Sequence, residues 1–312
     1  MMTSHSGAIM ECVPNFSEGI DAEKVRAIVA AMQVPGVSLL DWSLDPDHNR
    51  SVVTIAGSPA AVVEAAVLGA GHAASLIDLT RQKGVHPRIG AADVIPFVPI
   101  SGISLEQCAL CARQAALGLW DRFGVPSYLY EAAASRPDRV LLEDVRRGQF
   151  EGLREAVKRD VARRPDIGGP ELHHTAGASA VGARKFLIAY NVYLDCDDLT
   201  TARAIAREIR ASGGGLSGVK AMGVVVQGQA QISMNITDFK ATPVGRAYSA
   251  VKREAGRHKV CPVRGELIGL IPEAAYERES DWVRQLDGFD PGRKILERRL
   301  EHPLEWPART SW

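Results

Sequence analysis

The feature that most restricts the fold of this chain is an order of strands and helices that occurs twice in its 312 residues. Short apolar runs predict strands, and a 3.6-residue apolar period predicts helices. In the first half, strands are predicted at 8–13, 37–43, 50–56 and 93–98, and helices at 21–33 and 59–79. In the second half, strands are predicted at 185–194, 219–226, 230–239 and 267–271, and helices at 199–211 and 243–255. Each half therefore has the order β-α-β-β-α-β.

This order is typical of the ferredoxin-like domain, which has an antiparallel sheet and helices on one face. We therefore predict an α+β chain of two ferredoxin-like subdomains with antiparallel or mixed sheets. The first half has an added helix at 105–120 and a short strand at 127–130, so its strand order need not be the standard one. A loop rich in Gly, Pro and His at 165–182 ends the first half. The expected subdomains are residues 1–183 and residues 184–312, the second with a charged tail that contains Trp.

Alternation along the strand at 230–239 predicts one apolar and one polar face of the second sheet. The apolar set is Ala230, Ile232, Met234 and Ile236, and the polar set is Gln231, Ser233, Asn235 and Thr237. The polar face could border a crevice between the subdomains or be an ordinary solvated face, and the pattern favours neither.

Charge and composition exclude several classes of partner. The 37 Lys and Arg residues balance 37 Asp and Glu, so no net field would gather nucleic acid or an anionic membrane. Residues such as Glu64 and Asp93 interrupt the most apolar stretches, so we expect no membrane-spanning segment. The five cysteines are few and scattered, which indicates a reducing compartment and a cytoplasmic protein. An anionic small molecule would have to be bound by local cations.

The first candidate site is the segment 81–90 (RQKGVHPRIG), which places His86 among three cations and two glycines. Neighbouring cations disfavour the charged imidazole, so His86 would stay neutral and could accept a proton. An exposed loop histidine without a role is the alternative.

The second candidate is the segment 45–50 (DPDHNR), which precedes a predicted strand. Asp45 or Asp47 could orient an imidazole or bind a substrate amine, and Asn49 could cap a turn. A turn rich in Asp, Pro and Asn also needs no function.

The third candidate is a glycine-rich loop followed by basic residues. Glycine lets the backbone approach a flat ligand closely, and Arg184 beyond the loop could pair with a carboxylate. The spacing matches no phosphate-binding loop, and an interdomain linker explains the composition equally well. The loop residues are Gly168, Gly169, Pro170, Glu171, Leu172, His173, His174, Thr175, Ala176 and Gly177.

A zinc site could be built from His86, His173 and His174. Adjacent residues rarely converge on one ion, however, and no H-x-x-x-H spacing or matching carboxylate is present. We therefore expect no metal, and a metal-dependent hydrolase is kept only as an alternative.

Several motifs, taken together, resemble the formiminotransferase family. They are ECVPNFSEG at 11–19, DHNR at 47–50, LID at 76–78, HPRIG at 86–90, GARKFLIAYN at 182–191 and the strand at 231–238. The resemblance extends from about residue 10 to about residue 272. Its specificity comes from the combination of these motifs at these separations.

The resemblance implies two ferredoxin-like subdomains with a tunnel between them, and a homodimer. It implies transfer of a formimino group between N-formiminoglutamate and N5 of tetrahydrofolate in histidine catabolism, with tetrahydrofolate as co-substrate. It also implies that His86 is the catalytic base and that the loop at 168–177 contacts folate. The cyclodeaminase domain of fused family members is expected to be absent. Val85 and Ala176 depart from the family pattern, which often has Glu before the His-Pro pair and sometimes Trp in the loop.

These implications give each candidate residue a role. His86 would shuttle the proton, while Asp45 or Asp47 would hold the glutamate ammonium or orient the imidazole. Carboxylates of glutamate and of the folate tail would be bound by Arg50, Arg88 and Arg184. The amides expected to complete the binding set are Asn15, Asn49, Asn191 and Asn235. Two alternatives are formyl transfer from N-formylglutamate to tetrahydrofolate and a folate-binding protein without activity.

Overall fold

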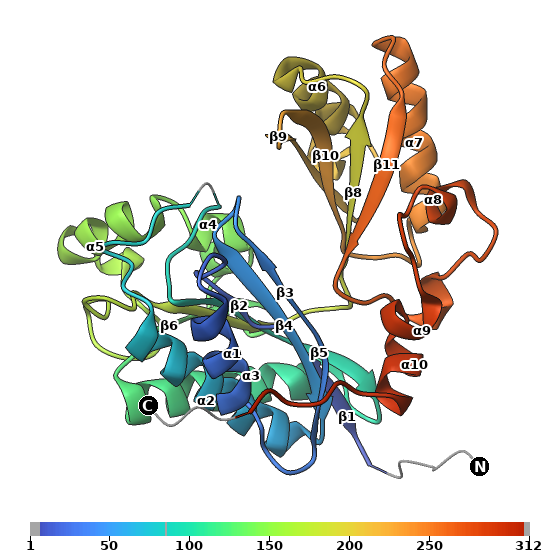
Figure 1. Ribbon diagram of the computed structural model, residues 1–312. Helices are drawn as coiled ribbons and strands as arrows, with labels where there is room; N and C mark the ends of the chain where they lie inside the picture. Colours follow the sequence, from blue (N-terminus) through green and yellow to red (C-terminus); the bar gives the residue numbers. More distant parts are fainter. Residues whose placement is uncertain (1–6, 85, 309–312) are drawn as a thin grey trace. The chain divides into compact units, whose positions relative to one another are not determined.

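The computed structural model describes residues 7–84 and 86–308. The chain divides into two compact units, which are coloured by sequence in Figure 1: one comprises Met1–Arg184 with Pro303–Trp312, and the other comprises Lys185–His302. The tail differs from the predicted division, in which all of it followed the second subdomain. From Pro303 onward it belongs to the first unit, where the Leu304 amide donates to the Leu39 carbonyl at 2.8 Å.

The first unit is built on a mixed sheet of seven strands. They are β1 (Ile9–Cys12), β2 (Asn15–Phe16), β3 (Val37–Asp45), β4 (Arg50–Gly57), β5 (Ala92–Ser101), β6 (Ser127–Glu131) and β7 (Ser179–Ala183). Strands β1 and β2 lie between β4 and β5, and β3 pairs with the other edge of β4. These pairings are antiparallel, whereas β7 pairs in parallel with both β5 and β6.

Strand β7 lies where the sequence predicted a continuous loop as far as residue 182. Its sequence, SAVGA, is short and follows a glycine-rich stretch, so it has little strand signal of its own. All five residues are buried, because the strand pairs on both sides. Burial in a parallel pairing, rather than local propensity, therefore defines this strand.

The principal helices of the first unit are α1 (Ala22–Ala31), α2 (Pro59–Leu76) and α3 (Leu105–Phe123). Asp21 caps α1, and Ser104 with Gln107 forms a capping box at the start of α3. Helix α2 is the one helix among the described residues that is long and apolar enough to cross a membrane. It packs between α1 and α3, with Val62, Ala66 and Ala70 in the core.

The second unit has an antiparallel sheet of four strands in the order β11-β8-β10-β9. The strands are β8 (Ile188–Leu194), β9 (Val219–Val226), β10 (Gln229–Ile236) and β11 (Pro262–Ile268). The helices are α6 (Leu199–Ile209), α7 (Val244–Arg257), α8 (Asp281–Arg284), α9 (Pro291–Lys294) and α10 (Leu296–Glu301). Figure 1 shows α6 and α7 against one face of this sheet.

The predicted alternation in β10 is confirmed on its apolar side, where Ala230, Ile232, Met234 and Ile236 are fully buried. On the other side Asn235 is exposed, but Gln231 is only 3% exposed. The predicted α+β class is confirmed, with one mixed and one antiparallel sheet.

Candidate active site

His86 lies in the loop between α2 and β5, in the first unit. Its Nδ1 atom is 2.9 Å from Arg50 Nη1 and 2.8 Å from the carbonyl oxygen of Pro87. Arg50 is a donor and the carbonyl is an acceptor, so Nδ1 can use only one of them in each tautomer. When Nδ1–H donates to Pro87, Nε2 is free to accept a proton.

A buried carboxylate holds the arginine that contacts His86. Asp93, at the start of β5, is fully buried, and its Oδ2 accepts from Arg50 Nη1 at 3.0 Å and from Arg146 Nη2. Its Oδ1 accepts from the Ile89 amide at 2.8 Å. Asp93 therefore joins the His86 loop, the start of β4 and the segment after α4 (Leu142–Val145).

The electrostatics of this cluster favour a neutral imidazole. Burial, followed by the charges of Arg50 and Arg146, lowers the pKa of His86 to about 3. Burial alone would raise the pKa of Asp93, but Arg146 and Arg50 hold it below its ordinary value. Burial and Arg146 lower the pKa of Arg50 to about 10, so Arg50 is still a cation at neutral pH. The predicted neutral His86 thus has a physical basis in the structure.

Asn15 and Asn49 make internal contacts rather than presenting a free amide. Asn15 Oδ1 accepts from Arg50 Nη2 at 2.7 Å and from Nε at 3.1 Å, and its Nδ2 donates to the Val13 carbonyl. Asn49 accepts from the Gly19 amide at 2.9 Å and donates to the Lys83 carbonyl at 2.7 Å. Its φ of 48° explains the residue type, since Asn tolerates this conformation better than most residues. Asn49 therefore ties the β3–β4 turn to the His86 loop.

Asp45 orients an imidazole, but the imidazole is that of His48. Asp45 Oδ2 lies 2.6 Å from His48 Nδ1, and this hydrogen bond raises the pKa of His48. The His48 and His86 rings lie edge to face with centroids 6.2 Å apart. Asp47 is exposed in the same turn. The structure therefore shows no contact of Asp45 with His86 that would orient it.

Arg88 is engaged in structural contacts and is largely buried. Its guanidinium donates to the side chain and carbonyl of Gln82 and forms an ion pair with Glu151 at 2.9 Å. These contacts join the His86 loop to α5 (Gln149–Arg159) and leave little of Arg88 for a substrate carboxylate.

The predicted folate loop is packed on the site's own backbone. The amides of Leu79 and Ala91 donate to the carbonyls of Thr175 and Ala176 at 2.8 Å each. Gly177 has a φ of +71°, and a side chain there would collide with the Ile89 carbonyl. Ala176 is 1% exposed and lies in the core, so its side chain offers no ligand surface.

The rest of the loop is held in place by other packing contacts. Residues Gly168 and Gly169 approach the Trp120 ring. His173 Nδ1 accepts from the Ala176 amide at 3.0 Å. Leu172 is buried, His173 and Thr175 are partly buried, and Pro170, Glu171 and His174 are exposed. Among the described residues, no three His, Cys, Asp or Glu side chains come together as a metal site, and Val85 lies outside that part of the chain.

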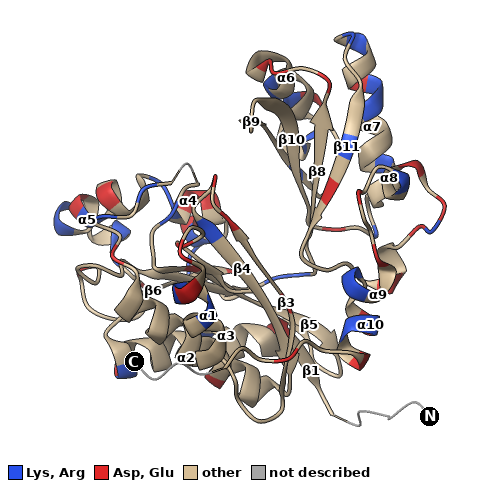
Figure 2. Cartoon of the chain, viewed as in Figure 1, with Lys and Arg blue, Asp and Glu red and all other residues tan. Residues whose placement is uncertain are grey.

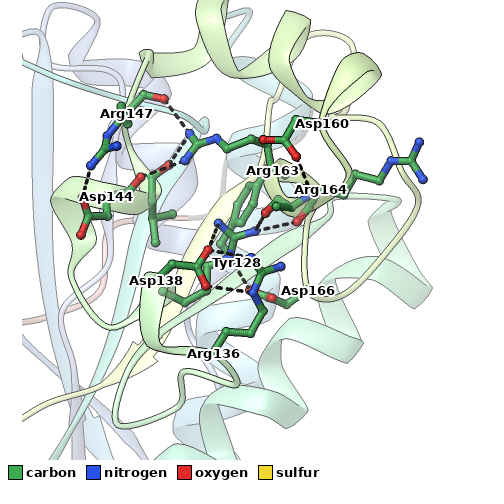
Figure 3. Close-up of polar contacts among 12 residues, drawn as sticks. Tyr128, Arg136, Asp138, Asp144, Arg147, Asp160, Arg163, Arg164 and Asp166 are labelled. Carbon is green, nitrogen blue, oxygen red and sulfur yellow. Dashed lines mark hydrogen bonds and ion pairs between the residues drawn. The ribbon is translucent and has the colours of Figure 1, made fainter.

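Figure 3 shows a network of hydrogen bonds and ion pairs that includes Asp144 and Arg147, the residues two before and one after Arg146 in sequence. Arg163 donates to the Asp144 carbonyl at 3.1 Å and the Arg147 carbonyl at 2.7 Å, on either side of Arg146. Arg139 is fully buried over the Tyr128 ring and donates to the carbonyls of Ala162 and Arg164. This network fixes the backbone from which Arg146 reaches Asp93.

We expect Arg139→Ala to lower the free energy of unfolding by about 3–5 kcal/mol, because it leaves the buried Asp166 carboxylate, 3.5 Å from Arg139 Nε, without this cation. Chemical denaturation followed by circular dichroism measures this change. Arg136→Ala is the matched control, since its ion pair with Asp138 is at the surface and should contribute less than about 1 kcal/mol. Equal losses in the two variants would contradict a structural role for Arg139.

The remaining predicted binding residues are Asn191, Asn235 and Arg184. Asn191 donates to Glu266 at 3.1 Å and Asn235 is exposed, and both belong to the second unit. Arg184, at the end of the first unit, is partly buried. Figure 2 shows acidic and basic residues interspersed in both units, with the two kinds close together beside α4.

Sequence reasoning missed Asp93 and Arg146 as site residues. Asp93 has one usable signal, because a carboxylate within an otherwise apolar buried strand needs a cationic partner. Arg146 has no such signal in the sequence, since it follows a helix of only four residues and stands beside another arginine.

Known proteins match this chain along nearly all of its length. Residues 9–184 match the family described as Formiminotransferase domain, N-terminal subdomain, and residues 189–297 match the Formiminotransferase domain. A glutamate formimidoyltransferase of Thermoplasma acidophilum is 45% identical over 299 residues, covering 94% of this chain and 98% of that protein. The Streptococcus pyogenes glutamate formimidoyltransferase is 43% identical, with the same coverage. The Gallus gallus formimidoyltransferase-cyclodeaminase is 41% identical over 86% of this chain and 51% of that protein.

Proposed function

This chain belongs to the formiminotransferase family, and from that membership we propose that it transfers a formimino group between N-formiminoglutamate and N5 of tetrahydrofolate, as in histidine degradation. The family membership confirms the resemblance seen in the sequence. The observation that supports this chemistry is the neutral imidazole of His86, whose Nδ1 atom lies between Arg50 and the Pro87 carbonyl.

The reaction needs a proton acceptor and a proton donor at one place. The N5 amine attacks the amidine carbon and loses its proton, and the glutamate nitrogen leaves with a proton. The Nε2 atom of His86 can accept the first proton and return it to the leaving nitrogen. Throughout, Nδ1–H donates to the Pro87 carbonyl, which fixes the ring and stabilises the imidazolium.

Tetrahydrofolate is the co-substrate in this proposal, and small anionic substrates are the partners. Glutamate and folate both carry carboxylates, which fit a cluster in which two guanidinium groups share the Asp93 carboxylate. We also propose that the protein acts in the cytoplasm as a homodimer, which sedimentation analysis of the purified protein would test.

The finer fold assignment is also part of the proposal. The order β11-β8-β10-β9 supports a ferredoxin-like second unit. In sequence, α6 connects β8 to β9 and α7 connects β10 to β11. The first unit has the equivalent strand order. Its sheet runs from β5 to the pair β1 and β2, then to β4, and then to β3. We therefore propose two ferredoxin-like subdomains, the first extended by the parallel strands β7 and β6.

The test is to incubate chelator-treated protein with tetrahydrofolate and N-formiminoglutamate, and to detect 5-formiminotetrahydrofolate by mass spectrometry. We expect product without added metal. Saturable folate binding without product would favour the binding protein, and product only from N-formylglutamate would favour formyl transfer. Metal analysis of the purified protein tests the hydrolase alternative, which would show a bound metal ion and no 5-formiminotetrahydrofolate.

A further inference from the structure

The cations around His86 differ in how many hydrogen-bond donors they have left. Arg50 donates from Nε and Nη2 to Asn15 and from Nη1 to Asp93, and Nη1 also lies 2.9 Å from His86 Nδ1. Arg88 uses Nε, Nη1 and Nη2 on Gln82 and Glu151. Both arginines therefore serve mainly to hold the site together.

Arg146 is the exception in this cluster. Among the described residues, only its Nη2 has a hydrogen-bond partner, which is Asp93 Oδ2. Its Nε is buried without any partner. The side chain is 13% exposed, and Nη1 is not among the buried atoms that lack a partner, so Nη1 is accessible. A buried guanidinium with unused donors is costly unless an acceptor completes it.

The cluster also has an excess of positive charge. Arg50 and Arg146 share one carboxylate, that of Asp93, while His86 is neutral. Tyr130 nearby is neutral too, because burial raises its pKa to about 12. Buried charge without compensation is unfavourable, and a bound anion would provide the missing negative charge.

We propose that Arg146 is the specificity-determining residue that binds a carboxylate of the glutamate substrate. This rests on the proposed function and gives Arg146 a task that the sequence analysis assigns to Arg50, Arg88 and Arg184. Guanidinium and carboxylate groups form strong charge-assisted hydrogen bonds, which distinguish a carboxylate from a neutral amide.

The same contact activates the base. Arg146 is one of the charges that keep His86 neutral, so a carboxylate on Arg146 offsets that charge. Offsetting it makes the imidazolium more favourable, which raises the basicity of His86 only when substrate is bound. The groups that act most strongly on His86 are Arg50, Arg146, Asp93 and the Pro87 carbonyl, and the His48 ring, paired with Asp45, lies edge to face with it. Substrate recognition and proton transfer are thereby coupled.

The test compares N-formiminoglutamate with analogues in which either carboxylate is a carboxamide. The wild type should prefer the dicarboxylate over one of the analogues by about 10- to 100-fold in kcat/KM, because one charge-assisted contact is lost. Arg146→Gln should abolish that preference and raise KM for N-formiminoglutamate, with KM for tetrahydrofolate unchanged. Arg147→Gln is the control, because this neighbouring side chain is 76% exposed and pairs only locally with Asp144.

Imidazole NMR with glutamate alone provides a measurement that needs no turnover. Glutamate should raise the pKa of His86 in the wild type and in Arg147→Gln, but not in Arg146→Gln. An unchanged carboxylate preference or an unchanged glutamate effect in Arg146→Gln would overturn the assignment. No 5-formiminotetrahydrofolate from the wild type would instead overturn the proposed function, while an Arg146-dependent glutamate effect would still identify a carboxylate site.

Discussion

His86→Ala is expected to lower kcat by about 10²- to 10⁴-fold, the usual contribution of a positioned acid or base. Folate binding should change little, because the variant removes neither the Asn15 nor the Asp93 contact of Arg50. Steady-state kinetics and fluorescence titration with tetrahydrofolate measure the two quantities separately.

An exposed histidine in the second unit provides the control for this variant. His258, after α7, is exposed, and His258→Ala should keep the wild-type rate. Added imidazole should restore part of the activity of His86→Ala, since the small molecule can occupy the space left by the ring. A His86→Ala enzyme with the wild-type kcat would exclude His86 as the base.

Much of the fold could be predicted because its signals are local. The alternation in β10 identified the buried face, since the side chains of a strand alternate with a period of two. Strand β7 could not be found in the same way, because its strand character comes from pairing with β5 and β6. The tail after Pro303 is a similar case, as its contact with Leu39 spans almost the whole chain.

The site could be predicted only in part, for a related reason. His86 and Arg50 each lie in a short polar segment that stands out from the sequence, and the structure joins them at 2.9 Å. Asp45 was expected to hold the substrate ammonium or to orient His86, whereas the structure pairs it with His48, three residues away. Arg146 is 53 residues from Asp93 in sequence, so only the folded chain reveals that pair.

Asp93→Asn should lower the free energy of unfolding about as much as Arg139→Ala does. The amide keeps the shape but removes the charge that two buried arginines share, and its NH2 group would face one of them. Breaking a buried ion pair by removing one partner costs about 3–5 kcal/mol, which denaturant unfolding would measure. Activity should also fall sharply, because Arg50 loses a contact that aligns it on His86.

The pH dependence of unfolding separates the charge of Asp93 from its shape. The pKa of Asp93 is lower in the folded than in the unfolded chain, so its stabilisation is present above the unfolded pKa. That stabilisation disappears as the pH falls through the folded pKa. The wild type should therefore lose stability with acid more steeply than Asp93→Asn, and the two unfolding free energies should converge at low pH. Parallel curves would mean that the carboxylate contributes through packing alone, and that its charge does not hold Arg50 and Arg146 in place.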